Sequence, residues 1–377
     1  MAMTQHHINA SSYKGPLAGI RIVEFAGIGP GPFAAMLLAD MGADIVRIDR
    51  IGGSDPWSGK VVRRNRSTLE LDLRNPVDIE TALNLIKHAD ALIEGYRPGV
   101  MERLGLGPDT CLALNPRLVF GRMTGWGQDG PLAKTAGHDI GYIAITGALA
   151  AIGPRDRPVP PLNLVGDLGG GSLYLVMGVL AAIIHARASG EGQVVDCAIC
   201  DGTVSLMSMF SDLVAQTKWQ LERETNVLDG VAPYYGVYEC SDGKHIAVGA
   251  LEPQFYAQLC QSLGRAVDDE GFRTDPRNWP SLRAAFAAIF KTQTQPHWCA
   301  VFEGSDACFA PVLTLDEAPL HPHLAARQTF VEANGLVQPA PAPRFSKTPG
   351  DIRAAESTHT DAQSVLRRWQ TSAAPKP

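Results

Sequence analysis

A histidine and an aspartate, each set in a glycine-bearing turn, are the residues of this chain best suited to move protons. His138 stands in the segment Gly-His-Asp-Ile, and Asp167 stands in Gly-Asp-Leu-Gly-Gly-Gly-Ser. An enzyme that inverts a stereocentre beside a carbonyl needs a base on one face of the carbon and an acid on the other. Two different titratable side chains therefore predict a proton transfer between opposite faces of one carbon atom.

Both residues also have an ordinary structural interpretation. The chain has ten histidines, and a histidine outside any motif is usually a surface residue or a satisfied core residue. Asp167 is a candidate helix N-cap, because the glycines and Ser172 after it lead into an apolar helical stretch. The two roles of Asp167 are compatible, since free N–H groups at a glycine-rich helix start can hold a developing oxyanion or a phosphate.

The order of strand and helix signals predicts how these residues are positioned. Helical composition at 33–41, and a cap followed by proline at Asn75, separate runs of strand character. Such alternation predicts an α/β domain with a parallel sheet, helices on both faces, and ligands at the carboxyl ends of the strands. The expected strands lie at 19–26, 43–48, 67–73, 91–96 and 117–123.

The pattern changes after the helix that begins near Ser172, and a second domain is expected there. Residues 201–224 are Met-rich and helical in composition. A hairpin is predicted within 234–248, turning at Cys-Ser-Asp-Gly, and the proline-rich stretch 338–343 is typical of an extended linker. Helices are expected at 253–263 and 280–291.

The segment after the first expected strand is rich in glycine and proline. Residues 27–32 are Gly-Ile-Gly-Pro-Gly-Pro, and Asp49 ends the next strand. This is similar to a dinucleotide-binding loop, but the spacing is G-x-G-x-G, and two prolines remove backbone donors that would hold a pyrophosphate. The segment therefore favours a structural turn or a site for another phosphate-bearing ligand.

Arginines gather where these strands are expected to end, although the protein has a net charge of -6. A guanidinium fork matches phosphate oxygens, so the cluster predicts a handle for a ligand with several phosphates. Solvated surface charge is the alternative for any one of them. The cluster consists of Arg47, Arg50, Arg63, Arg64, Arg66, Arg97 and Arg103.

Composition places the 377-residue chain among globular proteins of two domains, with 45% hydrophobic and 19% charged residues. Its negative charge argues against nucleic acid or an anionic membrane as partner.

Seven scattered cysteines indicate a reducing compartment, and Cys-Ala-Ile-Cys at 197–200 indicates packing instead of a metal site. The polar start 1–14 is unlike a signal peptide, and the apolar run 173–184 is shorter than the ~20 residues that span a bilayer. A cytoplasmic protein without a membrane segment is expected.

Several segments, in order along the chain, resemble the α-methylacyl-CoA racemases of the family III CoA-transferase superfamily. The similarity extends from about Gly15 to about Ser346. Its segments are VEFAGIGPGP at 23–32, EGYRPGV at 94–100, MTGWGQ at 123–128, GHDI at 137–140, PLNLVGD at 161–167, ALEPQFY at 250–256 and APRFS at 342–346.

The resemblance implies an interlocked homodimer built from a Rossmann-like large domain and a smaller α+β domain. The active site would lie between the large domain of one subunit and the small domain of the other. The expected divisions are a CoA-binding large domain at 1–195, a linker at 196–224, the small domain at 225–317, a linker at 318–337, and a return to the large domain at 338–377.

The resemblance also implies roles for individual residues. His138 is expected as one base, partnered by Glu252, and Asp167 as the other, supported by Asn163. The expected contacts with CoA and its thioester are Ile28, Arg50, Arg64, Arg97, Arg103, Tyr142 and the backbone of Asp139, with Arg64 taken from the arginine cluster.

Two positions depart from the family's motifs. Gly141 replaces the asparagine of Gly-His-Asp-Ile-Asn-Tyr, and Val231 replaces the second glycine of Asp-Gly-Gly-Ala-Pro. Both departures bear on the acyl pocket and on substrate identity more than on reaction type, because the expected proton carriers are intact.

The activity implied is a 1,1-proton transfer that interconverts (2R)- and (2S)-2-methylacyl-CoA thioesters through an enolate. No added cofactor is required, because CoA is part of the substrate. One alternative is CoA transfer, in which Asp167 attacks the thioester and carries a covalent intermediate. Another is a non-catalytic CoA-binding protein that uses the same arginines.

Overall fold

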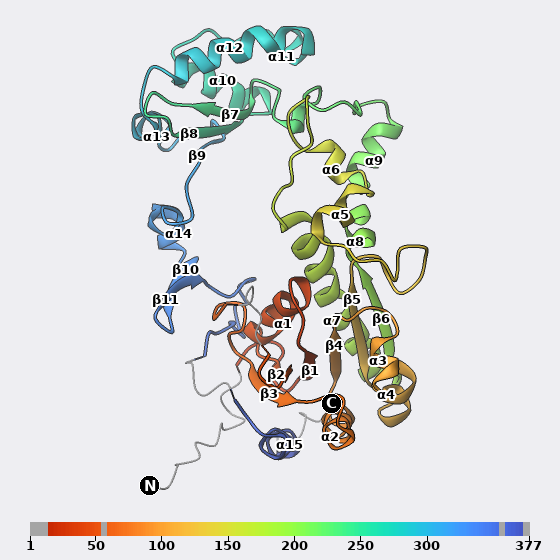
Figure 1. Ribbon diagram of the computed structural model, residues 1–377. Helices are drawn as coiled ribbons and strands as arrows, with labels where there is room; N and C mark the ends of the chain where they lie inside the picture. Colours follow the sequence, from red (N-terminus) through yellow and green to blue (C-terminus); the bar gives the residue numbers. More distant parts are fainter. Residues whose placement is uncertain (1–13, 54–58, 354–358, 372–377) are drawn as a thin grey trace. The chain divides into compact units, whose positions relative to one another are not determined.

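The computed structural model describes residues 14–53, 59–353 and 359–371 (Figure 1). The polar start expected at 1–14, apart from Lys14, and the end of the chain lie outside the described residues. The chain forms two compact units. The larger unit comprises the described residues up to Ala148, Pro161–Met207 and those from Gln328 onwards, and the smaller comprises Leu149–Pro160 and Ser208–Arg327.

A six-stranded sheet in the order β3-β2-β1-β4-β5-β6, with parallel pairing throughout, forms the centre of the larger unit. The predicted parallel α/β sheet is therefore confirmed. The strand order reverses between β1 and β4, the kind of position at which such sheets bind ligands. Of these strands only β6 was not expected, because half of its residues are exposed and its pattern lacks alternation. The strands are β1 Arg21–Phe25, β2 Asp44–Arg50, β3 Ser67–Leu71, β4 Ala91–Glu94, β5 Val119–Thr124 and β6 Gln193–Ala198.

Helices cover both faces of this sheet, as the alternating pattern predicts. Successive strand residues such as Ile22 and Val23 point to opposite faces and belong to two separate apolar clusters. Helices α1 and α7 complete one cluster, and α2, α4 and α15 complete the other. In Figure 1 α15 lies beside α2, with which it is in contact. The bounds are α1 Pro30–Asp40, α2 Pro76–Lys87, α3 Val100–Arg103, α4 Pro108–Leu114, α5 Asp139–Ala144, α7 Tyr174–Ser189, α8 Ile199–Leu206 and α15 Ala362–Thr371.

A glycine-rich π-helix, η2 (Leu164–Leu173), runs directly into α7. The continuous helix Leu164–Ser189 is the one candidate, within the described residues, long and apolar enough to cross a membrane by length and composition. It is longer than the apolar run 173–184 because its glycine-rich first part is helical too. Leu175 and Val179 are fully buried in the core, as in a helix that packs on a sheet.

The segment from Gln328 onwards belongs to the larger unit. It begins with a two-stranded hairpin, so the expected extended linker at 338–343 starts inside a strand. Arg368 of α15 forms an ion pair of 2.6 Å with Asp44 at the start of β2. The hairpin strands are β10 Phe330–Ala333 and β11 Leu336–Pro339.

The smaller unit combines a three-stranded antiparallel sheet with helices. The predicted hairpin within 234–248 is present as β7 and β8, and its aromatic side chains pack with α10, α12 and α13. The remaining elements of this unit connect these parts. The bounds are α6 Ala148–Ala151, α9 Ser208–Ala215, η3 Val227–Asp229, β7 Tyr235–Glu239, β8 His245–Gly249, α10 Pro253–Ser262, α11 Glu270–Thr274, η4 Pro276–Asn278, α12 Trp279–Phe290, α13 Gln295–Phe302, β9 Phe309–Pro311, η5 Ala318–Leu320 and α14 Pro322–Ala326.

The two compact units divide the chain at different residues from the expected domains. Residues 196–224, expected as a linker, contain the end of β6 and the helices α8 and α9. Helix α8 falls in the larger unit because it packs closely on η2, where a Cβ on Gly170 would lie 2.5 Å from Oγ1 of Thr203. The segment Leu149–Pro160 falls in the smaller unit although it precedes η2 in the chain.

Candidate active site

A cavity of about 680 Å³ opens in the larger unit at the carboxyl ends of the central strands. Its wall is formed by the segments that follow β1, β4 and β5, on either side of the reversal in strand order. Four of the residues predicted to do chemistry line it together: His138, Tyr142, Asn163 and Asp167. The two proposed proton carriers, which both lie in the connection between β5 and β6, therefore share one cavity.

His138 occupies the N-cap position of α5, in extended backbone conformation, and its side chain is exposed in the cavity. The carbonyl of His138 accepts hydrogen bonds from the N–H groups of Gly141 at 2.8 Å and Tyr142 at 3.2 Å. The short helix thus begins at a fixed backbone position. Because the His138 side chain makes no capping hydrogen bond and lines the cavity, the imidazole can meet a ligand there.

Asp167 lies in the first turn of η2, and Asn163 occupies the N-cap position. The expectation that Asp167 caps this helix is therefore wrong, because the helical segment starts earlier than its apolar part. The glycines of η2 allow close packing, since a Cβ on Gly171 would lie 3.2 Å from Pro30 at the start of α1. A π-helical turn of this kind is frequent at functional sites.

The carboxyl group of Asp167 lies in an environment that favours its protonated form. Burial raises the pKa of Asp167, the hydrogen bond from Nδ2 of Asn163 at 3.3 Å lowers it, the charge of Asp139 raises it, and the charge of His138 lowers it. The charge on His138 thus acts on Asp167, as expected of two groups in one site. A carboxylic acid with a raised pKa keeps its proton to higher pH and can act as a general acid.

Asp139 joins the two segments that carry His138 and Asp167. Its Oδ1 accepts a hydrogen bond of 2.7 Å from the N–H of Asp167. Burial raises the pKa of Asp139, and the backbone donors of Asp167 and Gly166 lower it. The N–H of Asp167 is thereby engaged within the protein, which corrects the expectation that this part of the glycine-rich turn is free for an oxyanion.

The Gly-Ile-Gly-Pro-Gly-Pro segment forms the wall opposite β4 and extends into the first turn of α1. Gly29 has a φ of 68°, and a Cβ there would lie 3.2 Å from Oδ2 of Asp167. Ile28 is 57% exposed and lines the cavity, as expected for a ligand contact. The segment therefore brings a backbone turn and one apolar side chain directly beside Asp167.

The predicted arginine cluster divides into exposed and buried members. Arg97 is exposed and lines the cavity, while Arg50 and Arg103 are exposed but outside its lining. Arg64 is buried and donates hydrogen bonds to Asp40, Gln338 and Pro339. Its prediction as a CoA contact is corrected, because this guanidinium ties β11 to the end of α1.

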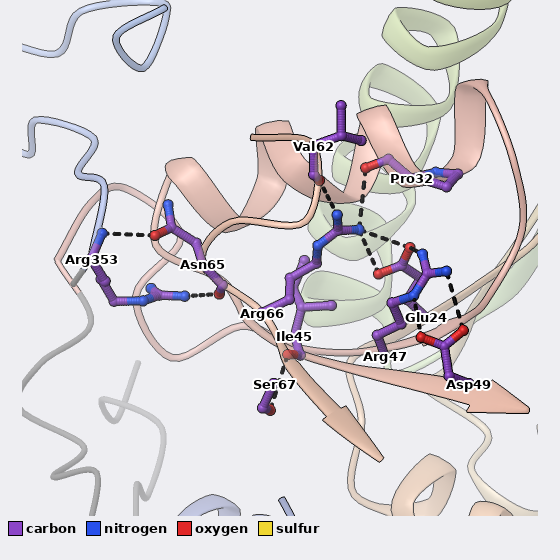
Figure 2. A network of polar contacts seen from close by, with 10 residues as sticks. All are labelled: Glu24, Pro32, Ile45, Arg47, Asp49, Val62, Asn65, Arg66, Ser67 and Arg353. Atoms are coloured by element: carbon purple, nitrogen blue, oxygen red, sulfur yellow. Dashed lines mark hydrogen bonds and ion pairs between the residues drawn. The ribbon is translucent and has the colours of Figure 1, made fainter. Parts of the chain in front are cut away.

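Two further arginines of the cluster, Arg47 and Arg66, meet on one buried carboxylate (Figure 2). Both contact Glu24 of β1, at 3.1 and 2.7 Å, and all three side chains are at most 2% exposed. Arg47 also pairs with Asp49, and Arg66 donates to the carbonyl of Pro32 at 3.2 Å. Through the bond from Arg66 to Pro32 this buried group supports the end of the glycine-rich segment. Neither guanidinium is available to bind a phosphate.

A second buried carboxylate, which the sequence argument missed, lies on the neighbouring strand β4, one residue beyond the register partner of Glu24. Glu94 ends β4, lines the cavity, and is 1% exposed. It accepts from the N–H of Tyr96 at 2.7 Å and from Arg122 of β5 at 2.9 Å. The turn that carries Arg97 is thereby fixed. An acid at the end of an otherwise apolar strand was the available signal.

Glu252, the expected partner of His138, lies in the smaller unit. It is exposed at the N-cap position of α10, where its carbonyl accepts from the N–H groups of Phe255 and Tyr256. Its association with His138 stays a prediction.

Cysteines have packing roles at the 197–200 segment. Cys197 is buried, and burial raises the pKa of its thiol to about 12. Among the described residues, no group of three or more His, Cys, Asp or Glu side chains is placed to hold a metal ion.

The chain matches the sequence model of CoA-transferase family III over residues 17–359. It belongs to CoA-transferase family III. The chain is 42% identical to alpha-methylacyl-CoA racemase of Mus musculus and 41% identical to that of Homo sapiens, over 88% of this chain and 87% of each relative. The crystal structure of a CAIB/BAIF family protein from Brucella suis shares the fold, with a TM-score of 0.79 and 23% identity over 95% of this chain and 99% of that one. In a CoA-transferase family III fold, the shared cavity of His138 and Asp167 is therefore a candidate acyl-CoA site.

Proposed function

We propose that this protein is an α-methylacyl-CoA racemase, an isomerase of lipid metabolism that interconverts (2R)- and (2S)-2-methylacyl-CoA thioesters. The observation that carries the proposal is that His138 and Asp167, from separate segments, line one cavity in which the charge of one affects the pKa of the other. The racemases of Mus musculus and Homo sapiens are the relatives that support this activity.

In one direction neutral His138 removes the α-proton, and protonated Asp167 delivers a proton to the opposite face. The reverse direction exchanges the two protonation states, so they must stay complementary. The raised pKa of Asp167 supports its role as the acid, because burial favours the form that still holds a proton. The C–H bond that breaks on one face is replaced by a C–H bond on the other, and no electron acceptor is needed.

The enolate oxygen needs stabilisation while the carbon is planar. A well-placed general base contributes about 10²- to 10⁴-fold, and one oxyanion donor about 10²- to 10³-fold, so both are required. We infer that the backbone at Asp139 lies near the thioester oxygen. Asp139 is suited to this place because its side chain accepts from the N–H of Asp167 and so fixes the spacing of the two segments.

The CoA portion would hold the substrate through its phosphates and thereby position the α-carbon. Ile28 and Arg97 line the cavity and would contact the part of CoA nearest the thioester. Arg50 and Arg103 are exposed at the same edge of the sheet, where they are the last residues of β2 and α3. We assign the remaining phosphates to them.

We propose that two copies of the chain form the functional homodimer, with a cytoplasmic location. The outer face of the η2–α7 helix supports a second copy, because Leu173, Met177 and Ile184 are each more than half exposed along one stripe. Exposed apolar patches of this kind mark interaction surfaces. Glu252 of a second copy would then pair with His138.

Deuterium uptake tests the proposed reaction. Racemisation of a 2-methylacyl-CoA in D₂O is expected to place deuterium at the α-carbon of both enantiomers. His138→Ala and Asp167→Asn are each expected to abolish racemisation and the exchange of the one enantiomer whose proton that residue removes. A panel of acyl chains, from short to sterol-like, then defines the substrate, on which the Gly141 and Val231 departures bear. Unchanged exchange in both variants would refute the site assignment.

CoA transfer is the second candidate, favoured by the family's own description and by the Asp167 carboxylate in the cavity. In that reaction the carboxylate attacks the thioester carbonyl and CoA leaves as a thiolate. Hydroxylamine separates the two candidates, because an aspartyl hydroxamate at Asp167 during turnover indicates transfer. Binding of CoA without either reaction would leave a non-catalytic CoA-binding protein.

A further inference from the structure

The ring of Tyr142 is held between two glycines of the cavity wall. A Cβ on Gly125 would overlap the ring, and a Cβ on Gly137 would lie 2.6 Å from it. The indole of Trp126 meets the same ring edge-on, with centroids 4.8 Å apart and an interplanar angle of 87°. These contacts fix the place of the Tyr142 side chain independently of its hydroxyl.

Tyr142 forms a hydrogen bond to the peptide group on each side of His138. Its hydroxyl donates to the carbonyl of Gly137, which belongs to the peptide entering His138. Its amide N–H donates over 3.2 Å to the carbonyl of His138, which belongs to the peptide leaving that residue. The His138 carbonyl also accepts from Gly141, whereas the Gly137 carbonyl accepts from the Tyr142 hydroxyl, so the Tyr142 hydroxyl contributes to the Cα–Cβ direction of His138 through the peptide that enters it.

We propose that Tyr142 is a positioning residue for His138, and that its hydroxyl acts on the backbone of Gly137 to aim the imidazole at the substrate's α-carbon. The inference rests on the proposed function, in which His138 carries a proton. It assigns the hydroxyl a different task from the thioester contact that the resemblance implies. A group at the thioester serves both directions of the reaction, whereas a group that positions His138 serves one face only.

Asp167 is held by a separate set of contacts. Its backbone N–H donates to Asp139, and its side chain accepts from Asn163. Loss of the Tyr142 hydroxyl therefore displaces one proton carrier and leaves the other in place. A displacement of about 1 Å from the productive geometry costs on the order of 100-fold in rate.

The experiment measures α-proton exchange into D₂O separately for the two enantiomers of one 2-methylacyl-CoA, in the full-length protein. His138→Ala identifies the enantiomer whose proton His138 removes, because exchange of that enantiomer is lost while Asp167 still exchanges the other. For Tyr142→Phe, exchange of the His138-dependent enantiomer is expected to fall about 10- to 100-fold. Exchange of the other enantiomer is expected to change less than about threefold.

Tyr238→Phe is the matched control. The Tyr238 hydroxyl likewise donates to a backbone carbonyl five residues earlier, that of Pro233 at 2.6 Å, but in the smaller unit. Exchange of both enantiomers is expected to stay unchanged in this variant.

Equal loss for both enantiomers in Tyr142→Phe would overturn the inference, since the hydroxyl would then act at the shared enolate. Unchanged exchange of both would overturn it as well. Absence of exchange in the unmodified protein would instead refute the proposed function itself, so the two failures are distinguishable.

Discussion

The N–H of Asp167 donates a hydrogen bond of 2.7 Å to Oδ1 of Asp139, the residue that follows His138. This bond links the two segments that carry the proposed proton carriers. Gly166 contributes to it through its lack of a side chain, because a Cβ there would overlap Oδ1 of Asp139. The distance between the two segments therefore depends on one carboxylate that takes no proton itself in the proposed reaction.

Replacement of Asp139 tests this link. Asp139→Ala is expected to lower kcat about 10- to 100-fold for both enantiomers, because the Asp167 segment is released and a partly buried N–H is left unpaired, at a cost of up to about 1–3 kcal/mol. Asp139→Asn keeps an acceptor oxygen and is expected to retain most of the activity. Initial rates of racemisation, measured beside thermal unfolding, compare the two. Equal activity of the alanine and asparagine variants would contradict the role.

Two glycines with a positive φ, one beside Asp167 and one outside the cavity, offer a second test. Gly29→Ala is expected to lower activity at least tenfold, because a φ of 68° with a ψ of -117° disfavours alanine by roughly 1–3 kcal/mol and the new Cβ crowds Oδ2 of Asp167. Gly335→Ala is the control, since Gly335 also has a positive φ, of 74°, but a Cβ there meets nothing within 4 Å and the residue does not line the cavity. Racemisation rates and unfolding temperatures are measured for both variants. Similar activity in the two would show that Gly29 has no special place beside Asp167.

Much of the fold could be predicted from local patterns. The strand alternation at 19–26 and 43–48 and the Asn75-Pro76 start of a helix each reflect one element's own chemistry, and Asn75 does accept from the N–H of Val77. The start of η2 could not be predicted in this way. Its glycines are poor helix formers, and they are helical here because α8 and α1 pack closely against them.

The residues of the candidate site divide in the same way, into those that local sequence predicts and those that depend on distant partners. The glycine-bearing turns at His138 and Asp167 have a chemical signature in their own sequence, and the structure brings both to one cavity. The arginines had the right chemistry for phosphate, but their partners lie far away in the chain. Glu24 pairs with Arg47 and Arg66 only after β1, β2 and the segment before β3 come together (Figure 2). Pairing of that kind is a property of the fold.

Substitution of an exposed arginine in the cavity is expected to affect substrate binding, and substitution of a buried, paired arginine is expected to affect stability. Arg97→Ala is expected to raise the KM for acyl-CoA about tenfold with little change in unfolding, because Arg97 is exposed and lines the cavity. Arg66→Met is expected to lower the free energy of unfolding by about 3–5 kcal/mol, because it breaks a buried ion pair. Arg74→Ala, which removes an exposed ion pair with Asp72, is the control for both measurements. A stable Arg66→Met protein with a raised KM would restore Arg66 as a phosphate handle.

The hydrogen bond from Asn163 to Asp167 predicts a shift in pH dependence. Asn163 donates to the ionised carboxylate and so lowers the pKa of Asp167, while burial raises it. In Asn163→Ala this hydrogen bond is lost, so the pKa of Asp167 rises further. The enantiomer that Asp167 deprotonates requires the ionised form, so the acidic limb of its kcat/KM profile is expected to move to higher pH.

Measurement of α-proton exchange against pH, for that enantiomer alone, follows this limb directly. Asn75→Ala is the matched control, since Asn75 caps α2 by accepting from Val77 and does not line the cavity. Its profile is expected to coincide with that of the unmodified protein. A limb in Asn163→Ala that stays in place, or moves to lower pH, would mean that Asn163 does not stabilise the ionised form of Asp167 during the reaction.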